Sequence, residues 1–307
     1  MLLRDKLLAL CIVLIWGVNF VVIKVGLEGM PSLLLAFLRF FFVAFPAIFF
    51  VKRPPVPFKW LFIYGITISF GQFALLFWAL KIGLPAGLAS LIAQVQAFVT
   101  IMLGALLLKE KIKLHNIVAI ILAAVGIFIL AIAQGSSAQS VSLLALALGV
   151  AGASCWAMGN IANKVIMHNH PAPTMSLIVW SALVPTGAFA LTSLLFDGST
   201  VMIEALEHIA WHNIFSIAYL SFLATIVGYG GWSFLLSRYA TSQVAPLSLL
   251  VPVFGLLSAF ILLGEKMNFH QLIGGVIIAI ALVINMFAPR FIPSLRHAQV
   301  ICSNQEN

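Results

Sequence analysis

Charged residues are scarce in this sequence. Of its 307 residues, 8% are charged and 63% are hydrophobic, whereas a typical soluble domain carries about 25% charged residues. A soluble domain of this length could not bury so much apolar surface. Together with a mean hydropathy of +1.16, the composition predicts an integral membrane protein with several spans.

Buried acids are also lacking. All eight acidic residues and all seven histidines fall in predicted loops or at the ends of predicted spans. An intramembrane hydrolase needs a buried acid or a metal ligand, and a proton pump needs a titratable carboxylate within a span. The sequence therefore argues against an enzyme, against a metal site and against coupling through a buried Asp or Glu.

Cysteine motifs and clustered positive charge are missing as well. Cys11, Cys155 and Cys302 share no CxxC spacing, so they indicate neither a metal centre nor a disulfide. The net charge of +8 comes from short loops and not from the clustered basic face that nucleic acid requires. The expected partners are a lipid bilayer and a small-molecule substrate, with no nucleic acid and no cofactor. The sequence predicts no oligomeric state.

What the sequence does contain is ten apolar runs bounded by charged residues, Pro, Gly or Ser. They cover residues 7–26, 33–51, 60–80, 86–108, 114–133, 142–166, 174–196, 213–236, 242–264 and 270–289. A helix of about 20 residues crosses a hydrocarbon core about 30 Å thick. We therefore predict an all-α integral membrane protein with ten transmembrane helices. The first run lacks a small-residue cleavage site, so we expect it to be retained rather than removed as a signal peptide.

The Lys and Arg distribution orients these helices. Cytoplasmic loops carry an excess of Lys and Arg. A cytoplasmic N-terminus leaves three of them outside, Lys24, Lys81 and Lys266, and puts twelve inside: Arg4, Lys6, Lys52, Arg53, Lys59, Lys109, Lys111, Lys113, Lys164, Arg238, Arg290 and Arg296. Both termini are therefore predicted to be cytoplasmic.

One polar stretch occurs twice. Residues 106–118 resemble residues 261–273, and Glu110 matches Glu265 at a spacing of 155 residues. A repeat of half the chain indicates two copies of one module. Two other pairs repeat at a spacing of 140, Trp16 with Trp156 and Lys24 with Lys164.

Each copy has an odd number of spans. Five spans fall in residues 1–136 and five in residues 137–290, which leaves 291–307 as a cytoplasmic tail. The second half must then enter the membrane from the opposite side, and Glu110 and Glu265 are expected on opposite faces. Inverted repeats are the common architecture of alternating-access transporters, with the substrate site near the midplane between the halves.

The two repeated glutamates are candidate gate residues. Glu110 and Glu265 end the fourth and ninth spans, where a helix C-terminus disfavours an anion. The repetition of an unfavourable position in both halves suggests a role such as a gating contact with Lys or Arg. The alternative is an interfacial charge paired with the adjacent Lys111 or Lys266, an exposed pair worth about 1 kcal/mol or less.

A single guanidinium lies inside a span. Arg39 follows Pro31 by eight residues, near the middle of the second span. An Arg at the bilayer centre costs a few kcal/mol, so it should face the bundle interior and find acceptors. Functionally, its planar guanidinium could attract and hydrogen-bond the carboxylate of an amino-acid substrate. The alternative is a structural Arg bonded to carbonyls of a neighbouring helix.

Gln94 breaks the symmetry of the two halves. It is the strongly polar member of a stripe of small residues in the fourth span, and Leu249 occupies the matching position of the ninth. Small residues let helices approach closely, but a purely structural stripe would match in both halves. We therefore take Gln94 as a candidate site residue, with an interhelical hydrogen bond as the alternative.

Other spans carry amide and aromatic groups that are expected to converge on a cavity for a small zwitterion. They are Trp16 and Asn19 in the first span, Gln72 in the third, Trp156 and Asn160 in the sixth, and Tyr229 and Trp232 in the eighth. The alternative for the aromatic residues is the interfacial belt of membrane proteins. That alternative explains Trp60 and Trp211 better than it explains the deeper Trp156 and Trp232.

The doubled five-span module with its Glu-Lys turn resembles the drug/metabolite transporter superfamily and, within it, the EamA family of exporters. The resemblance is carried by residues 16–26, 43–50, 85–90, 94–96, 175–185, 224–230 and 244–252. The segment Gln94-Val-Gln96 adds Gln96 to the candidate cavity residues.

This resemblance implies a bacterial inner-membrane exporter of cysteine-pathway metabolites, O-acetylserine and cysteine, which works by alternating access. It implies a central cavity lined by spans 1, 3, 4, 6, 8 and 9. Small four-span exporters of the superfamily rely on a Glu in the first span, where this chain has Asn19. Alternatives are export of other metabolites such as aromatic amino acids and, in a different class, a membrane scaffold or an intramembrane enzyme.

Overall fold

The computed structural model describes residues 1–132, 142–239 and 241–291. Within these ranges the chain is helical, with no strand, and ten segments are long and apolar enough to cross a membrane. They are Leu3–Gly26, Ser32–Phe49, Phe58–Lys81, Ala86–Leu108, Leu114–Ile132, Leu143–Asn169, Thr174–Phe196, Trp211–Arg238, Pro246–Leu263 and Phe269–Ala288. The prediction of an all-α protein with ten spans is confirmed.

The helices of the first half are α1 (Leu3–Gly26), α2 (Ser32–Ala44), η1 (Ala47–Phe49), α3 (Phe58–Tyr64), η2 (Gly65–Gly71), α4 (Gln72–Lys81), α5 (Ala86–Ala93), α6 (Val95–Leu108) and α7 (Leu114–Ile132). Those of the second half are α8 (Leu143–Asn169), α9 (Thr174–Ser181), α10 (Leu183–Phe196), α11 (Ser199–Glu207), α12 (Trp211–Ala218), η4 (Tyr219–Val227), α13 (Gly228–Arg238), α14 (Thr241–Val244), η5 (Ala245–Leu249), α15 (Leu250–Leu263) and α16 (Phe269–Phe291). Residues 133–141 and 292–307 lie outside the described ranges. The boundary at residue 136 and the tail therefore stay predictions.

Several spans are interrupted at matching places in the two halves. The third and eighth spans contain π-helical segments, η2 and η4. The fourth span breaks at Gln94 between α5 and α6, and the ninth changes from η5 to α15 after Leu249. Interrupted helices at membrane depth are tolerated where the irregular backbone is buried in protein or lines a cavity, and transporters commonly place them at the substrate site.

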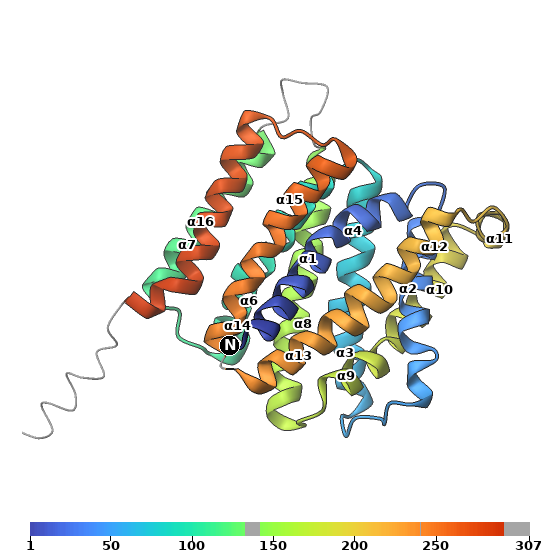
Figure 1. The fold of residues 1–307 in the computed structure, drawn as a ribbon, viewed down its shortest axis with the longest axis horizontal. Coiled ribbons are helices and arrows are strands. Elements are labelled where there is room, and N and C mark those ends of the chain that lie inside the picture. The colour runs from blue at the N-terminus through green and yellow to red at the C-terminus, as the bar shows by residue number, and fades with distance from the viewer. Residues whose placement is uncertain (133–141, 240, 292–307) are drawn as a thin grey trace, which may run out of the picture.

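Helices α7 and α16 lie side by side along one edge of the bundle (Figure 1). A Cβ added at Gly126 would meet the Gly274 carbonyl oxygen at 2.9 Å, so the two backbones cross in direct contact, as small residues allow. The side-chain amide of Asn116 donates to Asn285 Oδ1 at 2.9 Å. The outer side of α7 exposes apolar residues such as Ile121, which suits contact with lipid.

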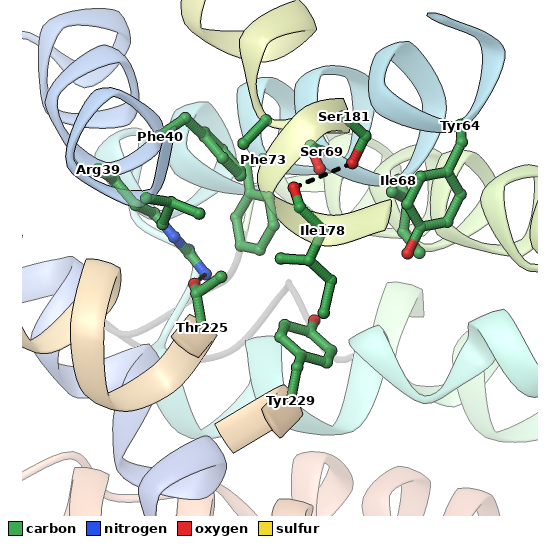
Figure 2. A pocket seen from close by; sticks show the side chains of 12 residues that line it. Arg39, Phe40, Tyr64, Ile68, Ser69, Phe73, Ile178, Ser181, Thr225 and Tyr229 are labelled. Atoms are coloured by element: carbon green, nitrogen blue, oxygen red, sulfur yellow. Dashed lines mark hydrogen bonds between the residues drawn. The ribbon is translucent and has the colours of Figure 1, made fainter. Parts of the chain in front are cut away.

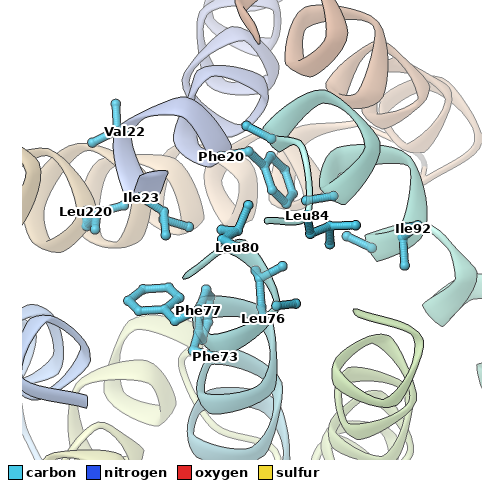
Figure 3. Close-up of a cluster of buried hydrophobic side chains, with 14 of the residues drawn as sticks. Phe20, Val22, Ile23, Phe73, Leu76, Phe77, Leu80, Leu84, Ile92 and Leu220 are labelled. Carbon is cyan, nitrogen blue, oxygen red and sulfur yellow. The ribbon is translucent and has the colours of Figure 1, made fainter. Parts of the chain in front are cut away.

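The interior is packed with apolar side chains from both halves. Figure 3 shows Phe20 and Ile23 of α1 with Phe73 and Phe77 of α4, and Leu220 of η4 belongs to the same cluster. Between membrane helices such packing stabilises through van der Waals contact rather than through expulsion of water. It holds α1 against both the third and the eighth span.

The two Glu-Lys turns lie at opposite ends of the bundle. Helices α6 and α7 meet at the end where the chain begins, and α15 and α16 meet at the other end (Figure 1). We call these the Glu110 end and the Glu265 end. Counting the ten crossings places Lys164 at the Glu110 end and Lys24 at the Glu265 end.

Candidate functional site

Glu265 closes its end of the bundle with three contacts. Its Oε1 atom lies 2.7 Å from Lys24 Nζ of α1. The same oxygen accepts the backbone N–H of Ala86 at 2.9 Å, and Oε2 accepts that of Gly87 at 3.0 Å. The first N–H groups of a helix lack partners within it and attract an anion. Glu265 therefore ties α15 to α1 and to the beginning of α5.

Glu110 makes the matching ion pair at the opposite end, with Lys164 of α8. Here the side chains are 45% exposed for Glu110 and 58% for Lys164, against 15% for Glu265 and 35% for Lys24. Each glutamate thus pairs with a lysine of the other half. Pairing with the sequence neighbour, the alternative considered above, is not the pairing that the described residues show.

The backbone places both glutamates in the same way. The residues before them, Lys109 and Gly264, adopt left-handed conformations with φ of 56° and 64°. The N–H of Glu110 donates to the Gly104 carbonyl at 3.2 Å, and that of Glu265 donates to Ala259 at 3.2 Å. A left-handed C-terminal cap turns the chain sharply back over the last helical turn. The carboxylate is thereby directed across the bundle end.

Helix α15 packs closely against α5 and α1. A Cβ added at Gly255 of α15 would lie 2.4 Å from the Ser90 Cβ of α5. A Cβ added at Gly17 of α1 would lie 2.4 Å from the Phe254 Cβ. At the Glu110 end the described part of the chain shows no packing of similar extent between α6 and the α14–η5 segment. Among the described residues, α15 thus packs against both α1 and α5, whereas its repeat equivalent α6 packs mainly against α8.

Two predicted amides form one cluster nearer the Glu110 end. The Asn160 side-chain amide of α8 donates to Gln96 Oε1 of α6 at 2.6 Å and to Thr100 Oγ1 at 3.2 Å. Gln94 lies at the joint between α5 and α6 and is half-buried. Thr100 was not predicted as a site residue, although it follows Gln96 by one helical turn and its hydroxyl donates a hydrogen bond to the Gln96 backbone carbonyl.

The predicted aromatic residues of spans 1 and 8 also come together. The Trp16 ring lies 5.4 Å from the Tyr229 ring and 5.2 Å from the Trp232 ring. Its indole N–H donates to the Ala224 carbonyl at 2.9 Å, within the π-helical η4. Asn19, on the next turn of α1, is buried, and its Oδ1 atom has no hydrogen-bond partner among the described residues.

Two candidates lie outside these clusters. Gln72 is buried at the start of α4, whose backbone there packs against Gly152 of α8. Trp156 is partly buried on α8 and packs against the main apolar core.

Arg39 lies in a small cavity between spans 2, 3, 7 and 8 (Figure 2). The side chain is 3% exposed, and its guanidinium carbon lies 4.0 Å from the Phe73 ring centroid. Nη2 lies 3.4 Å from Thr225 Oγ1, while Nε and Nη1 have no partner among the described residues. The described chain shows no bond from this guanidinium to a neighbouring carbonyl, which was the structural alternative. Tyr64, which also lines the cavity, was missed because one tyrosine in an apolar run carries no periodic signal.

Comparison with known proteins gives three results. A sequence profile described as the EamA-like transporter family matches residues 6–132 and 143–287. Proteins named "Probable amino-acid metabolite efflux pump" from Salmonella typhimurium and Escherichia coli K12 are each 53% identical to the chain, over 94% of it and 96% of their own length. One crystal structure shares the fold with a TM-score of 0.63 at 18% identity, covering 95% of this chain and 99% of the other.

Proposed function

This chain belongs to the EamA-like transporter family, and on that premise we propose that it exports small neutral amino acids and cysteine-pathway metabolites, O-acetylserine and cysteine, across the inner membrane by alternating access. It is a transporter and not an enzyme. The relatives named as amino-acid metabolite efflux pumps support this substrate class.

The observation that supports this mechanism is the presence of one ion pair at each end of the bundle, Lys24–Glu265 and Lys164–Glu110. Each ion pair joins one half to the other. If one pair breaks while the other is kept, the two halves can rotate relative to each other about a site between them, as alternating access requires. In the present state the Glu265 end is held by two additional N–H bonds. We propose that this state admits substrate from the Glu110 end, where the ion pair is the more exposed of the two.

Positive charge supports a cytoplasmic position for the Glu110 end. Lys109, Lys111 and Lys113 surround Glu110, whereas Lys266 alone follows Glu265 in its turn. An excess of Lys and Arg marks cytoplasmic loops. Both chain termini would then be cytoplasmic, and the state described here would be ready to take up substrate from the cell.

The polar clusters support a zwitterion as substrate. Arg39 offers a cationic donor, and the Gln96–Asn160 cluster offers neutral amides without a fixed charge. An aromatic amino acid is the alternative within the same class, because Trp16, Tyr229 and Trp232 form an aromatic group.

The test is flux of labelled O-acetylserine and cysteine in proteoliposomes, with phenylalanine and leucine as competitors and with or without a pH gradient. We expect saturable flux of the first two that the competitors leave unchanged. Inhibition by phenylalanine would move the substrate to aromatic amino acids, and no flux above empty liposomes would overturn the substrate class. Indifference to the pH gradient would identify a facilitator.

A further inference from the structure

The Arg39 guanidinium is a buried cation with no anionic partner among the described residues. No carboxylate lines its cavity, and the ion pairs of the described chain do not include it. Burying an unpaired charge is strongly unfavourable unless other groups compensate. The rings of Phe73 and Phe40, 4.0 and 5.3 Å from the guanidinium carbon, compensate in part by attraction between a cation and an aromatic face.

Hydrogen bonding leaves most of the guanidinium unused. Arginine presents five N–H donors, and the one bond found, to Thr225 Oγ1, is 3.4 Å long, beyond the usual range of about 2.7–3.2 Å. Two of its nitrogens are buried without any partner among the described residues. These donors face a cavity that the hydroxyl-bearing residues Tyr64, Ser69 and Tyr229 also line (Figure 2).

The cavity matches a carboxylate in size rather than a whole amino acid. Its volume is about 30 Å³, whereas a single water needs about 10–15 Å³ on the same measure. A group of two oxygens fits there, and the remainder of a ligand has to extend beyond it. Tyr229 lines the cavity and packs against Trp16, so it connects this cavity with the aromatic group of spans 1 and 8.

The repeat places the cavity between the halves but puts the charge on one side only. Pro46 matches Pro185 at a spacing of 139 residues, and the same spacing pairs Arg39 with Ile178. Both Arg39 and Ile178 line the cavity. A scaffold role would be met by similar residues in both halves, whereas one cation opposite an apolar residue gives a bound molecule a fixed orientation.

We infer that Arg39 binds the carboxylate of the transported molecule, with the Thr225 and Tyr229 hydroxyls as neighbouring hydrogen-bond partners. The inference rests on the proposed function in one respect, that the substrate is an amino acid. It adds that the carboxylate is recognised between spans 2, 3, 7 and 8, away from the Lys24–Glu265 and Lys164–Glu110 ion pairs. Substrates that lack the carboxylate should bind poorly for this reason alone.

The test compares Arg39→Gln with the wild type for binding of cysteine and O-acetylserine and of their methyl esters, followed by tryptophan fluorescence and by thermal stabilisation of the purified protein. We expect the wild type to favour the free acids at least about tenfold, as charged hydrogen bonds allow. The variant should lose this preference while binding the esters as before. Equal loss of acids and esters, or a preference that survives, would overturn the inference.

Two further arms separate the possible failures. Arg39→Lys keeps the charge but not the fork, so it should retain part of the preference, and it replaces Arg39→Gln if that variant does not fold. If the wild type binds neither metabolite, the proposed substrate is wrong, and acetate and propionate are compared with their amides in the same assay. An Arg39-dependent response to the carboxylates alone would still support the site, and its absence would overturn it.

Discussion

At the scale of single residues, Glu110 and Glu265 are equivalent in the sequence repeat but make different contacts. Glu110 makes an ion pair with Lys164, whereas Glu265 pairs with Lys24 and also accepts two backbone N–H groups at the start of α5. An ion pair survives exchange of its charges, but a lysine cannot accept a hydrogen bond. Exchanging the two charges of the ion pair should therefore reduce transport more at the Glu265 end than at the Glu110 end.

Exchanging the charges tests this difference. In Glu110→Lys with Lys164→Glu, the bridge is kept, and we expect at least half of the wild-type flux. In Glu265→Lys with Lys24→Glu, the N–H groups of α5 lose their acceptor and face a cation, so flux should fall at least about tenfold, since a lost bond to a charged group costs about 1.5–3 kcal/mol. Flux and melting temperature of both double variants are measured together. Equal behaviour of the two exchanges would contradict the capping role.

The sequence predicted these glutamates but not their partners. The glutamates were predicted as gate residues because they recur at the ends of two helices, where an anion is unfavourable. As ion-pair partners, the sequence suggested the adjacent lysines, Lys111 and Lys266. The observed partners, Lys24 and Lys164, lie in the other half of the molecule. Which lysine is near each carboxylate depends on how the halves pack, and local pattern does not contain that information.

At the scale of helices, hydropathy located the spans to within a few residues but not their irregularities. The first span begins at Leu3 rather than near residue 7 because Asp5 is buried and accepts the Tyr239 hydroxyl at 2.5 Å. The π-helical segments η2 and η4 have ordinary apolar sequences. Their altered hydrogen bonding is set by neighbouring helices, so composition alone does not predict it.

The contact of α5 with α15 gives a prediction for helix packing. Gly255→Val places a branched side chain against Ser90, where even a Cβ would lie at 2.4 Å. Overpacking costs about 1–3 kcal/mol, and the strain is relieved when α5 and α15 separate. We expect a melting temperature lower by several degrees and slower flux. Gly187→Ala, with nothing within 4 Å of the added Cβ, is the control and should change neither; a Gly255→Val variant as stable as this control would contradict the packing argument.

At the scale of the whole molecule, the predicted architecture holds. Ten spans in two five-span halves account for the described chain, and within it the two glutamates make different contacts. The sequence could predict this architecture because a repeat with an odd number of spans leaves little choice of topology. It could not predict which glutamate makes the additional contacts, because the two are equivalent in the repeat.

Orientation in the membrane is tested with a matched pair of cysteines. Lys111 and Lys266 are equivalent in the repeat, and each is replaced by Cys in a chain whose Cys11, Cys155 and Cys302 are replaced by Ser. A maleimide that does not cross membranes should label position 266 in intact spheroplasts and position 111 only after permeabilisation. The reverse pattern would invert the proposed orientation, and labelling of both positions in intact spheroplasts would contradict the inverted repeat.

Among the described residues, Glu265 makes two N–H bonds that Glu110 does not make, and these bonds have a kinetic consequence. They bias the empty carrier toward loading from the Glu110 side, which raises apparent affinity there, since apparent affinity scales with the fraction of competent molecules. Without an energy source this bias produces no one-way valve, because Vmax/KM must remain equal in both directions. The bonds break when the loaded protein opens toward the Glu265 side and form again when the unloaded protein returns, so the return after each export step runs toward the favoured state. The unloaded step that becomes slow is the opposite one, which transport from the Glu265 side to the Glu110 side requires. Metabolite on the Glu110 side should therefore accelerate this reverse transport, because it carries the binding site back in a loaded form.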